Sequence, residues 1–176
     1  MVVWRRVNES VWLPYSSVDG PRVGSVGVVS GFARTDMGAA LAGMHLFLRS
    51  TQYLGSEVFE PTLDVQVVGP FRDAVRASIR TEYQASKVRL NLADGDPIRF
   101  VGAVPTAFHV THLSPLEVGV EVVVEADHKF YVASYRLVWR TDDWRLIAQD
   151  PAKVGDVPVF DRLPAGYTLF PARAGG

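Results

Sequence analysis

Hydrophobic residues in the first half of the chain recur at the three- and four-residue steps of an α-helix. The clearest stretch covers residues 36–54, where Thr35 or Asp36 can accept the amide hydrogens of the first turn and Gly55 ends the pattern. Its apolar stripe comprises Met37, Leu41, Met44, Leu48 and Thr51. We therefore expect a helix that buries this one stripe against the rest of the domain.

Two further helical segments are predicted after the first. A short helical turn is expected over residues 61–68, ended by Gly69. A second long helix is predicted to start at Pro70, because proline lacks an amide hydrogen that the first turn would leave unbonded anyway. Residues spaced by four form its buried face: Phe71, Val75, Ile79 and Tyr83. The basic side chains on its other side are mostly Arg72, Arg76, Arg80 and Lys87.

From about residue 98 the apolar period changes from 3.6 to 2, which indicates β-strands. The segment 117–125 shows this best, since valines at its even positions alternate with glutamates and a glycine. Strands at 117–125, 130–140 and 144–148 are expected to be linked as hairpins. A strand at 99–113 precedes them and should be kinked, because Pro105 cannot donate to a sheet ladder.

The order of these elements predicts an α+β fold in which N-terminal helices pack on a curved four-stranded antiparallel sheet. Such a sheet, bent by its kinked first strand, would form a cone that encloses a cavity together with the helices. We expect three parts along the chain. They are an extended leader at residues 1–35 packed on the body, the α+β cone domain at 36–150, and a proline-rich docked C-terminal arm at 151–176.

The composition restricts the classes of function. The chain has 18 basic and 19 acidic residues, so its net charge of -1 gives nucleic acid little electrostatic attraction. It contains no cysteine, which excludes thiol catalysis and cysteine-bound zinc. No apolar run approaches the roughly 18 residues that a membrane helix needs, and the N-terminus has no secretory apolar core. We therefore expect a cytoplasmic protein, unless a membrane anchor was removed upstream of Met1.

The four histidines of the chain are His45, His109, His112 and His128. His109 and His112 lie three residues apart on one expected strand, so their side chains should point to opposite faces, which argues against a shared metal. The sequence has no zinc-ligand spacing, no GxSxG nucleophile elbow and no phosphate-binding glycine loop. It therefore predicts no metal site and no cofactor.

A cone cavity could desolvate a carboxylate and raise its pKa, which is the basis of an enzymatic interpretation. The residues expected to line such a cavity are Tyr53, Tyr83, Phe108, His112 and Tyr135. Asp64, Asp73 and Glu82 are expected on solvated helix faces instead. No catalytic residue is assigned.

Arg72, Arg76 and Arg80 form a basic row at four-residue spacing on the second long helix. The simpler interpretation of this row is a solvated helix face, and the functional one is a surface for an acidic partner or lipid head groups. These three arginines are the partner-binding candidates of the sequence.

Several short motifs are spread from about Trp4 to Phe170. They are Leu13-Pro14, Val18-Asp19-Gly20-Pro21, Ser30-Gly31-Phe32-Ala33-Arg34-Thr35, Gly38-Ala39-Ala40-Leu41-Ala42, Val58-Phe59-Glu60-Pro61-Thr62, Gln66-Val67-Val68-Gly69-Pro70, Trp144-Arg145-Leu146 and Ala165-Gly166-Tyr167-Thr168. With these motifs the chain resembles a group of actinobacterial proteins encoded on conjugative plasmids and integrative elements. The resemblance implies a short cytoplasmic tail, one membrane helix and an external domain similar to the nuclear-transport-factor-like cone of TcpC-like scaffold proteins. This chain departs from the group by lacking the membrane helix.

The leading functional hypothesis, implied by the resemblance, is a non-enzymatic scaffold or interaction domain of a conjugation or type IV secretion-like transfer apparatus. Its partners would be other apparatus proteins or further copies in a homo-oligomer, and an anchored form would lie on the extracytoplasmic face of the membrane. The alternative is an isomerase- or cyclase-like small-molecule enzyme, or a ligand-binding protein, that uses the cone cavity. An open cavity with a desolvated carboxylate or histidine would favour the enzyme, whereas a cavity filled by apolar side chains would favour the scaffold.

Overall fold

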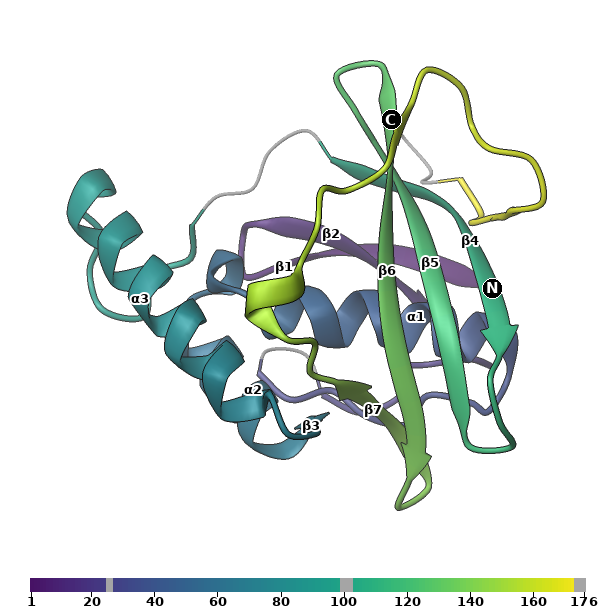
Figure 1. The fold of residues 1–176 in the computed structure, drawn as a ribbon, viewed down its shortest axis with the longest axis horizontal. Helices are drawn as coiled ribbons and strands as arrows, with labels where there is room; N and C mark the ends of the chain where they lie inside the picture. Colours follow the sequence, from purple (N-terminus) through teal and green to yellow (C-terminus); the bar gives the residue numbers. More distant parts are fainter. Residues whose placement is uncertain (25–26, 99–102, 173–176) are drawn as a thin grey trace.

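The computed structural model of the protein describes residues 1–24, 27–98 and 103–172 (Figure 1). Three helices pack on a mainly antiparallel sheet of seven strands, and a separate β-hairpin precedes them. The predicted α+β class, with helices ahead of the long antiparallel strands, is confirmed. None of the helices within these ranges has the length and apolar character needed to cross a membrane.

Helix α1 (Asp36–Arg49) lies at the centre of the fold. Thr35 caps its N-terminus, since its Oγ1 atom accepts a hydrogen bond of 3.0 Å from the amide of Gly38. Ten of the 14 residues of α1 are buried, because the helix contacts both the large sheet and the N-terminal hairpin. The prediction of a single buried stripe is therefore wrong. The small residues Ala40 and Gly43 are buried as well as the predicted Leu41.

The segment after α1 differs from the prediction in its boundaries. Residues 52–54 form a separate 3-10 turn, η1 (Gln52–Leu54), rather than the last turn of α1. The short helical turn expected at 61–68 is part of a longer helix, α2 (Ser56–Val65), with Pro61 in its interior. The last residues of the predicted turn are not helical. They form strand β3 (Val67–Val68), which follows α2.

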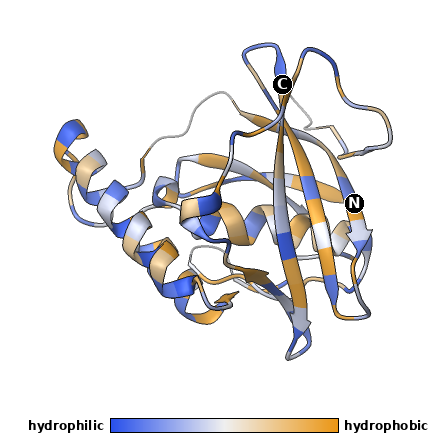
Figure 2. Ribbon diagram, in the orientation of Figure 1, coloured by the Kyte–Doolittle hydropathy of each residue, from blue (hydrophilic) through white to orange (hydrophobic). Residues whose placement is uncertain are grey.

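Helix α3 (Arg72–Leu90) starts just after Pro70, as predicted. Its main contacts are with α2, η1 and the turn η2 (Pro151–Lys153), and hydrophilic and hydrophobic segments alternate along it in Figure 2. Of the residues of α3, Tyr83 is the single buried one, and the predicted apolar face is otherwise half-buried. Two residues of this face, Val75 and Ile79, line an open groove.

The large sheet has the strand order β3-β7-β6-β5-β4-β9, and β8 pairs with β6 beside this path. Its long antiparallel strands are β4 (Val104–His112), β5 (Glu117–Ala126), β6 (Lys129–Arg140) and β7 (Asp143–Ile147). Short strands complete it: β3, which is parallel to β7, β8 (Val159–Phe160) and β9 (Thr168–Leu169). The prediction of four strands curled into a cone is wrong: the sheet has seven strands and is open, because its end strands do not pair with each other.

Strand β5 has the side-chain alternation that its sequence predicts. Val118, Val120 and Val122 are buried on the face toward α1, and the glutamates lie on the opposite face. The kink expected at Pro105 is present as a shift of register between Pro105 and Ala107 in the pairing of β4 with β5. The start of the predicted strand, at residues 99–102, lies outside the described ranges.

The N-terminal leader is more regular than the extended segment that was predicted. Strands β1 (Val2–Val7) and β2 (Val11–Ser16) form an antiparallel hairpin that buries Leu13 and Tyr15 beside α1. The hairpin supplies the second layer over α1, which explains why that helix is buried on most of its surface. The division into leader, body and arm stays a prediction.

The C-terminal arm contacts the body through the short strands β8 and β9 and through the buried side chain of Phe170. Most other apolar side chains of the arm are exposed, including Val154, Val157, Val159, Phe160, Leu163 and Leu169. The Phe170 ring is 6% exposed, and its centroid lies 4.9 Å from that of Phe108 and 6.5 Å from that of Trp4. The Nε1 atom of Trp4 also donates a hydrogen bond of 3.0 Å to the carbonyl of Pro171. The arm therefore closes the core between β1 and β4.

Replacing Phe170 by alanine should lower the free energy of unfolding by about 3 kcal/mol, because it removes a buried ring and leaves a cavity. Urea denaturation measures this change. The matched control is Leu169→Ala, whose side chain is 62% exposed, and we expect a change below about 0.5 kcal/mol. Equal effects of the two substitutions would show that Phe170 does not anchor the arm.

Candidate functional site

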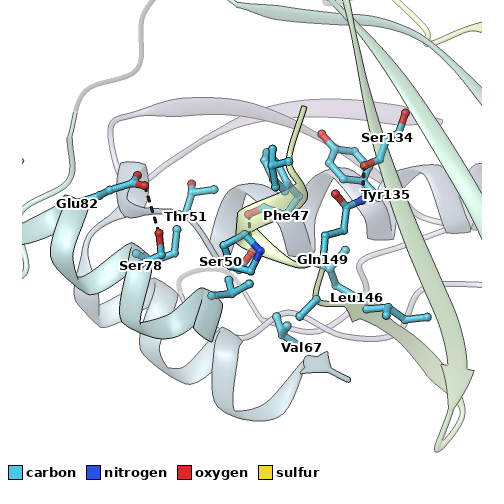
Figure 3. Close-up of a pocket in the computed structure, with 16 residues that line it drawn as sticks. Phe47, Ser50, Thr51, Val67, Ser78, Glu82, Ser134, Tyr135, Leu146 and Gln149 are labelled. Carbon is cyan, nitrogen blue, oxygen red and sulfur yellow. Dashed lines mark hydrogen bonds between the residues drawn. The ribbon is translucent and has the colours of Figure 1, made fainter. Parts of the chain in front are cut away.

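A groove of about 290 Å³ lies between helix α3 and the edge of the sheet formed by β6 and β7 (Figure 3). The C-terminal end of α1, strand β3 and the turn η2 complete its walls. The segments that meet here are far apart in the sequence. They come together because β3 pairs with β7 and brings the start of α3 next to the sheet.

Much of the groove surface is apolar. Its apolar and aromatic side chains include Phe47, Val75, Ile79, Tyr135, Leu146 and Val154. The rings of Phe47 and Tyr135 have centroids 4.7 Å apart and stack at an angle of 35°. Burial raises the pKa of the Tyr135 hydroxyl, so this phenol stays protonated at neutral pH. A ligand bound in the groove would therefore contact aliphatic and aromatic surfaces.

The polar part of the groove contains hydroxyls, amides and one carboxylate. These side chains are Ser50, Thr51, Ser78, Glu82, Ser134 and Gln149. Glu82 accepts hydrogen bonds from Gln52 Nε2 at 2.9 Å and from Ser78 Oγ at 3.4 Å, and it is exposed to solvent. Gln149 Nε2 donates a hydrogen bond of 3.0 Å to the carbonyl of Ser134. Among the described residues that line the groove, none is a buried carboxylate or a histidine.

A second cavity, of about 250 Å³, lies at the N-terminal end of α1. His112 Nε2 lies 2.8 Å from Asp36 Oδ1 at its wall, and both side chains are exposed. Arg34 also lines this cavity and places its guanidinium 5.7 Å from the ring centroid of Trp139. The two exposed partners form a surface ion pair when His112 is protonated, which contributes little to stability.

The structure does not bring the five predicted cavity residues together. Tyr135 lies in the groove, and His112 lies in the second cavity. Tyr83 is buried against Phe59 and donates a hydrogen bond of 2.9 Å from its hydroxyl to the Asp96 carbonyl. The other two pack elsewhere in the core: Phe108 against Phe170, and Tyr53 in η1.

The arginine row of α3 takes part in ion pairs within the chain. Arg80 pairs with Glu60 of α2 through contacts of 2.6 and 2.8 Å, and Arg76 pairs with Asp64 of the same helix. Arg72 pairs with its neighbour Asp73 at 3.2 Å. The acidic groups of a partner would therefore have to compete with Glu60, Asp64 and Asp73 for these arginines. The partner-binding role of these arginines stays a prediction.

His109 and His112 lie on opposite faces of β4, as their spacing predicts. The His109 ring contacts Tyr167 of the C-terminal arm, with centroids 5.8 Å apart, whereas His112 faces Asp36 of α1. Over the described ranges, no group of three or more metal-binding side chains lies close enough to hold an ion.

His45 is buried in the centre of α1, in a polar cluster that the sequence does not reveal. Its Nε2 atom lies 2.8 Å from the Pro14 carbonyl, and its ring packs edge-on against Tyr15 with centroids 4.8 Å apart. The Arg49 guanidinium, also buried, donates to the Tyr15 hydroxyl at 3.1 Å. Burial, and secondarily the Arg49 charge, lowers the pKa of His45 to about 3. The histidine is therefore neutral in the folded protein at physiological pH.

This pKa predicts a specific loss of stability in acid. Below pH 6.5 the unfolded chain protonates His45 whereas the folded chain does not, so the free energy of unfolding falls as the pH falls from 6.5 toward 3. The loss attributable to His45 should reach about 2 kcal/mol at pH 5. Chemical denaturation at pH 7 and pH 5 measures it, and His45→Gln should remove this part of the pH dependence. An unchanged difference between the two pH values in the variant would contradict the assignment.

Two of the motifs that carry the family resemblance, at residues 30–35 and 144–146, meet in a junction ahead of α1. Asp143, 5% exposed, accepts backbone hydrogen bonds from Gly31 at 2.9 Å, from Phe32 at 3.2 Å and from Trp144 at 2.9 Å. The Nε1 atom of Trp144 donates to the carbonyl of Ala33 at 3.0 Å. These residues hold the loop before α1 to the start of β7, and we name them the α1 junction. The sequence does not reveal this role of Asp143, because Gly31 and Phe32 lie more than a hundred positions away from it.

A comparison with protein families gives one match. The model described as "Domain of unknown function (DUF8175)" matches residues 1–168. No curated protein and no solved structure matches the chain.

Proposed function

We propose that this chain, which belongs to the DUF8175 family, is a non-enzymatic interaction domain that binds a partner protein in the groove between α3 and the β6–β7 edge. The supporting observation is the lining of that groove, which combines apolar and aromatic side chains with hydroxyls, amides and one solvent-exposed carboxylate. Such a surface can bury an apolar side chain of a partner. None of its described lining residues is a buried carboxylate or a histidine of the kind that acid–base catalysis most often uses.

The setting that we propose is a conjugation or type IV secretion-like transfer apparatus. This proposal rests on the motif resemblance, and the partner would be another apparatus protein or a further copy of the chain. A relation to the nuclear-transport-factor-like class is part of the same proposal, supported by the order in which all three helices precede the four long strands. An anchored form of the protein would present the domain outside the cytoplasm.

A small-molecule role is the second candidate. The groove volume of about 290 Å³ is close to the lower end of the range for small-molecule sites, about 300 Å³. The second cavity adds the His112–Asp36 pair, an arrangement that can move protons. We rank this role second because that pair is exposed and lies away from the groove.

The proposed function is tested by transfer efficiency in cells that carry the gene on its mobile element. Ile79→Ser removes an apolar side chain from the groove, and we expect transfer to fall by about tenfold, the equivalent of about 1.4 kcal/mol of binding. The matched control on the same helix is Val88→Ser, whose side chain is 80% exposed and outside the groove. It should transfer like the parent.

Folded protein must be confirmed for both variants by thermal melting. Parental transfer with a folded Ile79→Ser variant would refute the interaction role of the groove. Loss of transfer on replacing His112 by glutamine, with no effect of Ile79→Ser, would support the catalytic alternative instead.

A further inference from the structure

We infer that the outer edge of strand β1 is a second interaction surface, which binds an acidic segment of a partner protein as an added antiparallel strand. This inference goes beyond the proposed function, because none of the described residues that line the groove belongs to β1. It follows from the position of β1 in the N-terminal hairpin, the direction of its main-chain groups and the charge along it.

Strand β1 is the outer strand of the two-stranded hairpin sheet (Figure 1). Strand β2 pairs with residues 2–7 of β1 on one side, and its other side faces α1, where the Pro14 carbonyl lies 2.8 Å from His45 Nε2. Five of the six residues of β2 are buried, whereas the single buried residue of β1 is Val7. Within the described ranges no strand pairs with the second side of β1, which is therefore an open edge.

Two contacts define which main-chain groups of β1 point to this edge. At the turn of the hairpin, the Val7 carbonyl accepts a hydrogen bond of 3.0 Å from the Ser10 amide, so Val7 points toward β2. Pro14 has no amide hydrogen, lies opposite Trp4 and directs its carbonyl to α1. Because successive residues of a strand point to alternate sides, the amides and carbonyls at positions 2, 4 and 6 point outward. Over the described part of the chain, these groups have no hydrogen-bonding partner.

The exposed charge along this edge is basic. Arg5 and Arg6 are both exposed, and as neighbours in a strand they lie on opposite faces of the hairpin. The Arg5 guanidinium lies 5.0 Å from the centroid of the Tyr15 ring. Among the described residues, neither arginine forms an ion pair with a carboxylate, in contrast to the arginine row of α3. An added strand with acidic residues at these two positions would complement both charges.

The side chains of β1 define the sequence that an added strand needs. In antiparallel pairing, hydrogen-bonded pairs would form with Arg6, Trp4 and Val2. Two adjacent acidic residues would lie beside Arg6 and Arg5, and the apolar residue after them would lie beside the half-buried Trp4. Val3, which is 47% exposed, offers an apolar contact on the opposite face. The order is therefore acidic, acidic, apolar, read toward the C-terminus of the partner segment.

A second copy of the chain fits this edge less well. If two β1 edges paired with the longest overlap, Trp4 would lie opposite Trp4 of the second copy, and the two Arg5 side chains would be diagonal neighbours. Like charges at this separation repel, and charged side chains on an edge strand are a known protection against pairing with further copies. The same charges attract an acidic strand. The edge therefore suits a different protein.

The first test uses a fluorescein-labelled peptide that contains two glutamates followed by leucine, threonine and valine, with binding to the full chain measured by fluorescence polarisation. N-methylation of the amides that would face β1, those of the first glutamate, the leucine and the valine, should weaken binding by at least about tenfold. N-methylation of the second glutamate and the threonine, whose amides would point away from β1, is the matched control and should change binding by less than about twofold. Bound peptide should slow hydrogen exchange at the Trp4 and Arg6 amides more than at those of Val3 and Arg5, which face β2.

The contribution of charge is tested separately. Replacing both glutamates of the peptide by glutamine should weaken binding by about fivefold. Arg6→Gln should weaken binding of the glutamate peptide by about threefold and leave binding of the glutamine peptide unchanged. Raising the salt concentration should reduce the difference between the two peptides.

The matched protein variants are Arg6→Pro and Arg6→Ala. Both remove the same charge, but proline also removes the outward amide at position 6, and an edge strand can accommodate it. The glutamine peptide should therefore bind Arg6→Pro about fivefold more weakly than Arg6→Ala. If thermal melting shows that Arg6→Pro does not fold, the comparison of the two methylated peptides on the parent protein decides.

Each of four results would overturn the inference. Equal binding of the two methylated peptides would show that the peptide does not pair with β1. Loss of binding in Ile79→Ser, with no effect of Arg6→Pro, would place the peptide in the groove and leave the proposed function intact. Absence of binding at about 1 mM peptide would refute the edge, while the transfer assay would still decide on the groove. Sedimentation of the parent as a dimer and of Arg6→Pro as a monomer would assign the edge to a second copy.

Discussion

Replacing Gly38 by alanine is expected to lower the free energy of unfolding by at least about 4 kcal/mol, although alanine favours a helix over glycine by about 1 kcal/mol. A Cβ atom at position 38 would lie 2.1 Å from the carbonyl oxygen of Ala33 and 2.9 Å from its carbonyl carbon. Non-bonded atoms do not approach so closely. Either the first turn of α1 or the loop before it would have to move.

The loop cannot move cheaply because the α1 junction holds Ala33 from two sides. Its carbonyl accepts a hydrogen bond of 3.0 Å from the Trp144 side chain, and its amide donates one of 3.0 Å to the Asp19 carbonyl. Shifting the Ala33 peptide would break both bonds and leave half-buried polar groups unpaired. Relieving the steric conflict at position 38 would therefore cost these two hydrogen bonds.

Guanidinium denaturation measures the effect, and Gly119→Ala is the matched control. A Cβ atom at position 119 would lie 3.9 Å from Leu113 Cδ1, an ordinary contact, so the change should stay within about 1 kcal/mol. A Gly38→Ala protein as stable as the parent would show that the loop before α1 is free to shift. The tight junction inferred from the hydrogen bonds would then be wrong.

The spacing of apolar residues correctly predicted the buried face of an element that packs on α1 through one face. The alternation in β5 gave the correct face for Val118 and Val122, because one face of that strand packs on α1 and the other does not. The same reasoning failed for α1, because alanine and glycine give little hydrophobic signal. The residues buried beside the predicted stripe, Ala40 and Gly43 among them, are covered by a hairpin and strands that approach closely because these residues are small.

The groove was harder to predict than the fold, and Tyr135 was the one predicted cavity residue that lies in it. The sequence placed a cavity between the helices and the sheet, but α1 fills that space. The groove lies further out, between α3 and the β6–β7 edge, where residues 149–157 leave the sheet. Its position depends on the β3–β7 pairing and on the interruption between β7 and β8, and neither has a local sequence signal.

Removing the carboxylate of Asp143 should also cost about 4 kcal/mol. Asp143→Ala would leave the buried or half-buried amides of Gly31, Phe32 and Trp144 without their acceptor. Each orphaned amide costs about 1–3 kcal/mol. Asp143→Asn keeps one acceptor oxygen and should fall between alanine and the parent. Denaturation midpoints measure the series, and the exposed Asp156→Ala should behave like the parent.

The two large effects should not add, because they act on the same loop. Once Asp143→Ala has released Gly31 and Phe32, the backbone at Ala33 can shift to make room for a Cβ atom at position 38. A double-mutant cycle should therefore show a coupling of about 1–2 kcal/mol, with the double variant less destabilised than the sum. Phe170→Ala, at the other end of the sheet, should combine additively with Asp143→Ala. Additivity of Gly38→Ala with Asp143→Ala to within about 0.5 kcal/mol would mean that the junction is not one cooperative unit.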